Sequence, residues 1–166
     1  MNEAWKKHIQ PILDSWQWDH FSWVWDPFYT KYPKFSEEQK EQVDHALATC
    51  AFDESNEKSA IKALGIAGFL QNNHLVSQRL SDLIKDGLRE KITSLEVDSV
   101  LTIDYVIACK FFGIKEAIPY LQRLVLQIEE RKANGSLDEK PFPKSHTYRE
   151  MLEKYISIIQ DLLHDP

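Results

Sequence analysis

Residues 93–131 have the sequence TSLEVDSVLTIDYVIACKFFGIKEAIPYLQRLVLQIEER and form the most apolar part of the chain. Thr93 and Glu96 have the spacing of a capping box, which predicts that a helix begins here. Apolar residues cover most of its circumference, so we expect a helix that is buried on several sides. Gly113 can take the left-handed conformation that ends a helix. The first half of this stretch is therefore predicted to be one helix from about residue 94 to 112.

A second helix is predicted to follow directly. Pro119 falls in its first turn, where a missing N–H costs little, and Asn134-Gly135 stops it. Together the two helices make an antiparallel hairpin over about 94–132. Four of its apolar residues are expected to be almost fully buried: Leu101, Phe111, Leu121 and Leu124.

The same pattern occurs earlier in the chain, where a first antiparallel hairpin is predicted over about 56–86 and Asp86-Gly87 is expected to end its second helix. A shift of 41 residues lays 66–84 on 107–125 and matches apolar with apolar residues along both segments. Helix-turn-helix units of about 40–47 residues are typical of HEAT and armadillo arrays. Over about 36–131 the chain resembles HEAT-like helical repeat proteins, which implies an all-α fold of stacked antiparallel hairpins. A compact helical bundle with a chance match is the alternative.

Length and composition favour one domain of 166 residues with a substantial core. We divide it into an aromatic N-terminal cap (1–35), helical repeats (36–131), a loop (132–146) and a C-terminal helix (147–166). The cysteines, Cys50 and Cys109, are predicted to be buried free thiols of a reducing compartment. No apolar run suits a signal peptide or a membrane span, so a cytoplasmic monomer is expected. The net charge of −6 argues against direct nucleic-acid binding.

All five tryptophans of the chain lie within residues 1–35. The simplest interpretation is an aromatic cap that closes one end of the helical stack. The alternative is a patch for a partner or a ligand. Within this region Trp5, Ile9, Ile12 and Trp16 have the spacing of one helix face, and Trp18, Phe21, Trp25 and Phe28 that of a second short helix. If the patch binds a partner, Trp18 and Trp23 are the best candidates for exposed residues, because Trp23 fits neither of these stripes.

Residues 36–60 hold most of the charge imbalance, with seven acids against two lysines and a net charge of −5. Ser36 and Gln39 form a second capping box, and Glu37, Glu41 and Asp44 are predicted to form a solvent-facing stripe. Carboxylates at this spacing repel one another by about 0.2–0.5 kcal/mol per pair. A solvated face is the common explanation of such a run. The alternative is a surface for a basic partner, made of Glu37, Glu38, Glu41, Asp44, Asp53, Glu54 and Glu57.

The last helix is predicted to begin at a third capping box, Thr147 with Glu150. Its buried stripe is expected to be Leu152, Tyr155, Ile156, Ile159 and Leu163. In the central hairpin, Asp104 shares a face with apolar residues and is expected to be partly buried. Pairing with a basic residue of the neighbouring repeat would account for it.

No catalytic or phosphate-binding motif is present, and the six histidines share no metal-ligand spacing. Asp19, His20 and Asp26 could bind a cation, but their spacing is not that of ordinary metal ligands, and we interpret them as ordinary surface residues. We therefore expect no enzyme activity, no metal and no cofactor.

Three functions remain. Small size, acidity and helical repeats resemble, in type, the acidic immunity proteins of bacterial toxin and contact-dependent inhibition systems. That resemblance implies a protein that binds and neutralises a basic, nuclease-type toxin domain. The alternatives are a HEAT-type scaffold or assembly adaptor, and a ligand-binding protein or enzyme that uses the Trp-rich end.

Overall fold

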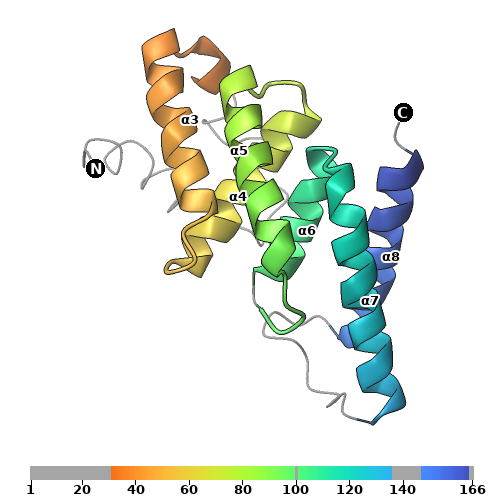
Figure 1. Ribbon diagram of the computed structural model, residues 1–166. Coiled ribbons are helices and arrows are strands. Elements are labelled where there is room, and N and C mark those ends of the chain that lie inside the picture. Colours follow the sequence, from red (N-terminus) through yellow and green to blue (C-terminus); the bar gives the residue numbers. More distant parts are fainter. Residues whose placement is uncertain (1–30, 100, 136–146, 165–166) are drawn as a thin grey trace. The chain divides into compact units, whose positions relative to one another are not determined.

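The computed structural model describes residues 31–99, 101–135 and 147–164 (Figure 1). Within these ranges every regular element is a helix, which confirms the all-α prediction. The chain divides between Ile84 and Lys85 into two compact units. The expectation of a single domain concerns both units together and stays a prediction.

The first unit contains four described elements: η2 (Tyr32–Lys34), α3 (Glu37–Ala51), α4 (Glu57–Asn72) and the start of α5 (Gln78–Lys91). The predicted capping box of Ser36 and Gln39 is confirmed, and the side chain of Asn56 caps α4. α3 packs against α4. Small residues of α4, Ala60, Ala63 and Ala67, are fully buried, and small side chains let helices approach closely.

The second unit contains the end of α5, then η3 (Ile92–Ser94), α6 (Thr102–Phe111), η4 (Lys115–Ala117), α7 (Ile118–Ala133) and α8 (Tyr148–His164). α8 packs against both α6 and α7, as Figure 1 shows. Gly113 has a φ of 64°. This left-handed residue lets the N–H of Ile114 reach the carbonyl of Cys109, 2.9 Å away, and ends α6 as predicted.

Two predicted helix boundaries are wrong. Thr93 does not start a helix: it lies in η3, and its hydroxyl donates to the carbonyl of Glu90. α6 begins only at Thr102, and residues 95–99 form a non-helical segment. At the end of the earlier hairpin, α5 runs past Gly87 to Lys91, because the next apolar position, Leu88, is fully buried and holds the helix together.

The predicted core is confirmed at Leu101, Leu121 and Leu124 and is wrong at Phe111. Phe111 is the last residue of α6 and is 39% exposed, while Phe112, just beyond the helix, is buried.

The buried face of α8 was also predicted wrongly, although the capping box of Thr147 and Glu150 is confirmed. The residues that α8 buries are Met151, Tyr155, Ile158 and Leu162. Ile156 and Leu163 lie on the exposed side, and only Tyr155 belongs to both sets.

None of the helices in residues 31–99, 101–135 and 147–164 combines the length and the apolar character that crossing a bilayer requires.

Candidate functional site

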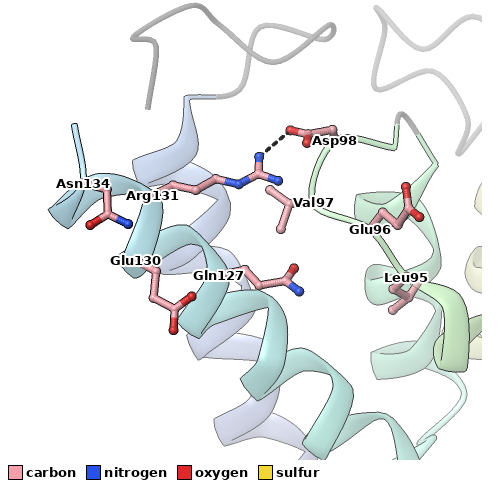
Figure 2. Close-up of a pocket in the computed structure, with 8 residues that line it drawn as sticks. All are labelled: Leu95, Glu96, Val97, Asp98, Gln127, Glu130, Arg131 and Asn134. Carbon is pink, nitrogen blue, oxygen red and sulfur yellow. Dashed lines mark hydrogen bonds and ion pairs between the residues drawn. The ribbon is translucent and has the colours of Figure 1, made fainter. Parts of the chain in front are cut away.

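A surface pocket of about 420 Å³ lies in the second unit, between the non-helical segment 95–98 and the C-terminal half of α7 (Figure 2). Its volume falls in the range of small-ligand sites, about 300–1,000 Å³. Most of its lining is polar. The lining residues are Leu95, Glu96, Val97, Asp98, Gln127, Glu130, Arg131 and Asn134.

The first wall is the segment 95–98, in which buried and exposed residues alternate. Leu95 and Val97 are buried, whereas Glu96 and Asp98 are exposed. This period of two is typical of extended chain, and Leu95 indeed has an extended backbone. Leu95 and Val97 anchor the segment in the core. The carboxylates of Glu96 and Asp98 therefore lie at the surface.

Hydrogen bonds from both following helices fix this wall. Thr102 Oγ1 donates to the Glu96 carbonyl at 2.6 Å, and Arg123 Nη2 donates to the Leu95 carbonyl at 3.3 Å. The segment has no helical or strand ladder of its own, so hydrogen bonds from side chains, together with one from the Ser99 N–H to the Glu96 carbonyl, satisfy its backbone.

The second wall is one face of α7. Gln127, Glu130, Arg131 and Asn134 are spaced i, i+3, i+4 and i+7, which places them on a single helix face. The neighbouring face of the helix buries Leu121, Leu124 and Ile128 in the core of the unit. Gln127 and Arg131 project from α7 toward the segment 95–98 (Figure 2).

One ion pair joins the two walls. Arg131 Nη1 lies 2.8 Å from Asp98 Oδ1, and the Tyr148 hydroxyl of α8 donates to the same oxygen at 3.3 Å. The hydrogen bond that Arg131 donates to Asp98 lowers the pKa of Asp98 and raises the pKa of Arg131. Both groups are therefore charged at neutral pH.

The pocket carries three carboxylates and one guanidinium, a net charge of −2. Asp98 is paired with Arg131. Glu96 and Glu130 are exposed, one on each wall, and no described residue forms an ion pair with either side chain. The uncompensated charge of the pocket therefore lies at its rim, where it favours a cationic ligand.

The seven acids predicted as one surface do not form one. Glu37, Glu38 and Glu41 are exposed at the start of α3, and Asp53, Glu54 and Glu57 are exposed beyond its end. The 15 residues of α3 separate the two groups by roughly 20 Å at 1.5 Å per residue.

Asp44 was predicted to face solvent, and this is wrong, because its side chain is fully buried. It accepts hydrogen bonds of 2.6 Å from both the Tyr32 hydroxyl and the Ser77 hydroxyl, and Arg79 Nη1 lies 3.6 Å away. Ser77 Oγ in turn accepts from the N–H of Leu80 in the first turn of α5. Asp44 thus ties η2, α3 and the start of α5 together, which is a structural role.

Contacts within the protein account for several of the exposed acids, so these acids do not require a protein partner. Glu37, Glu38 and Glu57 lie in first turns of helices, where the helix dipole favours negative charge. Glu37 also pairs with Lys40, and Asp53 accepts from the backbone and hydroxyl of Ser55. Of the predicted stripe, Glu37 therefore has a partner within the protein and Asp44 is not at the surface at all.

The other candidate residues fall into two groups. Trp18, Trp23, Asp19, His20 and Asp26 lie outside the described residues. Asp104 is half-buried on α6, as predicted, and its expected pairing with a basic residue stays a prediction. Elsewhere in the described part, no three His, Cys, Asp or Glu side chains are grouped closely enough to hold a metal ion.

Sequence reasoning missed the pocket because it placed residues 95–98 inside a helix. Two signals pointed to it. The alternation Leu-Glu-Val-Asp indicates extended chain, and the polar stripe from Gln127 to Asn134 marks a face of α7 that the core does not use.

Comparisons with known proteins place the chain in no family: no family model, no curated protein and no solved structure matches it.

Proposed function

We propose that the protein is a non-catalytic binding module for a basic protein partner. The observation that carries the proposal is the pocket between segment 95–98 and α7, with its net charge of −2 and two unpaired carboxylates at its rim. A basic surface placed against it would neutralise that charge and steer the encounter of the two proteins.

The charges elsewhere on the chain support the same partner class. The whole chain has a net charge of −6, and the acids at both ends of α3 are exposed. A field of one sign raises the association rate with an oppositely charged protein more than it raises the final affinity.

The chemistry of the pocket also favours binding over catalysis. A general acid or base works best with a pKa near the working pH. The pKa of Asp98 is lowered by the hydrogen bond from Arg131, and the pKa of Arg131 is raised by the same contact. Both shifts move the pair away from proton transfer at neutral pH and toward a fixed ionic contact.

More narrowly, we propose that the protein is a cytoplasmic immunity protein that neutralises a basic, nuclease-type toxin domain. Its support is the type resemblance of a small, acidic, helical chain. Carboxylates at such a surface would occupy positions that nucleic-acid phosphates take on a nuclease.

A HEAT-type scaffold is the second candidate, and one observation favours it. The shift of 41 residues carries α5 (Gln78–Lys91) onto 119–132, inside α7 (Ile118–Ala133). Leu80 and Leu121, which the shift aligns, are both fully buried. Repeats of this kind form extended surfaces for partners.

The test begins with cross-linking of the tagged protein in its native host, followed by purification of the enriched protein and direct binding measurements. The proposal expects a partner with a high pI, whose affinity falls as salt rises. A partner that is acidic, or whose binding does not depend on salt, would contradict it. The immunity form further predicts that the purified partner arrests growth and that co-expression of this chain restores it. A partner that does not arrest growth would instead favour the HEAT-type scaffold function.

A further inference from the structure

We infer that the pocket receives one arginine side chain of the basic partner, held between segment 95–98 and α7. This inference rests on the proposed function and adds the chemical group that is recognised. Five features carry it: the volume of the pocket, its fixed walls, the placement of its charges, its openness and its supply of hydrogen-bond acceptors.

The walls of the pocket are fixed before any ligand binds. Leu95 and Val97 anchor one wall in the core, and the Asp98–Arg131 ion pair connects it to α7. A preformed site of about 420 Å³ therefore needs little ordering of the backbone when a side chain enters it.

The charges that the ligand would meet are those of Glu96 and Glu130, because Asp98 is already paired with Arg131. In Figure 2 Glu130 points along α7 and Glu96 points away from α7. Both side chains are exposed, so rotation about their own bonds can bring the carboxylates onto a bound cation. Holding them there costs side-chain entropy, which keeps the expected affinity for a single side chain low.

Neutral acceptors complete the site. The side-chain carbonyl oxygens of Gln127 and Asn134 lie on the α7 wall, and they can accept N–H bonds beside the two carboxylates. A guanidinium has five N–H donors in a planar fork and is more weakly hydrated than an ammonium. It can therefore use several separated acceptors at once, whereas a lysine would remain hydrated in so open a site.

The openness of the pocket favours a protein side chain over a free small molecule. Sites for small molecules bury about 70–90% of the ligand and are mostly apolar. Here only Leu95 and Val97 of the lining are buried, and the remaining residues are exposed or half-exposed. Such a site can cover one side chain of a docked protein, and arginine is among the residues enriched at the centres of interfaces.

The inference is tested by titrating isotopically labelled protein with Nα-acetyl-arginine methylamide, while backbone amide shifts are followed by NMR. We expect saturable shifts confined to residues 95–98 and 127–134, with a Kd in the millimolar range, which corresponds to about −4 kcal/mol. Nα-acetyl-lysine methylamide should bind at least about threefold more weakly. The citrulline analogue, which keeps the shape without the charge, should cause no saturable shift.

Charge-neutral variants supply the matched controls. Glu96→Gln with Glu130→Gln should weaken arginine binding at least about fivefold, because it removes both uncompensated charges. Glu90→Gln with Glu129→Gln removes the same charge from exposed positions outside the pocket and should leave the titration unchanged. Glu129 is the direct neighbour of Glu130 on α7, so this pair also controls for effects on the helix.

Each other outcome overturns the inference. If the lysine probe binds as tightly as the arginine probe, the pocket is a general cation site. If the citrulline probe does so, charge does not determine binding. Amide shifts outside residues 95–98 and 127–134 would mean that the probe binds elsewhere. None of these results by itself ends the proposed function, whose own test is the charge of the partner and the salt dependence of its binding. Conversely, a partner that proves acidic would end the proposed function even if the pocket binds arginine.

Discussion

Arg131 Nη1 and Asp98 Oδ1 are 2.8 Å apart, and this ion pair links the C-terminal half of α7 to the extended segment before α6. The two residues are 33 positions apart in the sequence. The pair is largely exposed, so its own contribution to stability is small, about 0–1 kcal/mol. It joins the two walls of the pocket, while burial of Leu95 and Val97 holds the segment in place.

The first prediction concerns the titration of Asp98. Its pKa is lowered, mainly by the hydrogen bond from Arg131. The carboxylate therefore contributes stability that is fully present above its unfolded-state pKa of about 3.9 and is lost as the pH falls through the lower folded value. An NMR titration of the Asp98 carboxyl should show a midpoint below about 3.9.

Two variants separate the causes of that shift. Arg131→Gln should move the midpoint upward, toward the ordinary value of a carboxyl. Tyr148→Phe should move it less, because the Tyr148 hydroxyl is the weakest of the contributions to the shift. An unchanged midpoint in Arg131→Gln would mean that the ion pair does not persist in solution.

The second prediction compares two buried tyrosines. The Tyr32 hydroxyl donates to buried Asp44, whereas the equally buried hydroxyl of Tyr155 has no hydrogen-bond partner among the described residues. Tyr32→Phe leaves a buried carboxylate short of a donor and should lower the free energy of unfolding by about 1–3 kcal/mol. Tyr155→Phe removes only an unsatisfied group and should be neutral or stabilising. Urea denaturation of both variants checks this, and equal losses would contradict the assigned contacts.

The third prediction tests the core of α7. Leu121 is fully buried and Leu126, on the same helix, is 57% exposed. Leu121→Ala should reduce the free energy of unfolding by about 2–5 kcal/mol, through lost burial and the cavity that remains. Leu126→Ala serves as the control and should stay within about 0.5 kcal/mol of the wild type. If both variants lose the same amount of stability, the assigned face of α7 is wrong.

The fourth prediction concerns the two free cysteines. Burial raises the pKa of Cys50 to about 11 and that of Cys109 to about 12. The thiolate is the reactive form, so neither residue should react with a thiol reagent at pH 8 in the folded protein. Both should react in denaturant, which provides the control. Rapid labelling of either thiol in the native state would show that its helix opens readily.

Several elements could be predicted from the sequence because their signals are local. Capping boxes at Ser36 and Thr147 involve residues three apart, and they were found correctly. Gly113 and Asn134-Gly135 ended helices for the reason expected, since a left-handed residue is needed there.

The errors arose where tertiary contacts outweigh local signals. The Thr93–Glu96 spacing suits a capping box, but Val97 and Leu95 are buried in an extended segment instead. Gly87 is a helix breaker by propensity, but burial of Leu88 and Ile92 carries α5 past it.

The faces of two helices could not be determined from periodicity. α8 has two adjacent apolar stripes with the same spacing, one through Met151 and Ile158 and the other through Leu152 and Ile159. Periodicity alone does not choose between them. Asp44 was placed on the polar face of α3 because its partners, Tyr32 and Ser77, lie on other elements.

The candidate site was the least predictable part. The sequence identified acidity as the main property, but it assigned the charge to residues 36–60. The pocket instead combines a non-helical segment and a helix that are about 30 residues apart in the chain. Only the fold brings Glu96 and Glu130 to the same pocket.

Recognition of a basic partner at this pocket is tested most directly by the rate at which the purified partner associates with the protein, at low and at high salt. We predict that Glu96→Lys with Glu130→Lys slows association by about tenfold or more at low salt, and that the difference shrinks as salt rises. The control Glu90→Lys with Glu129→Lys, and the surface variant Glu37→Lys with Glu41→Lys on α3, should change it much less. An association rate that is the same in wild type and Glu96→Lys/Glu130→Lys at both salt concentrations would contradict recognition of a basic partner at this pocket.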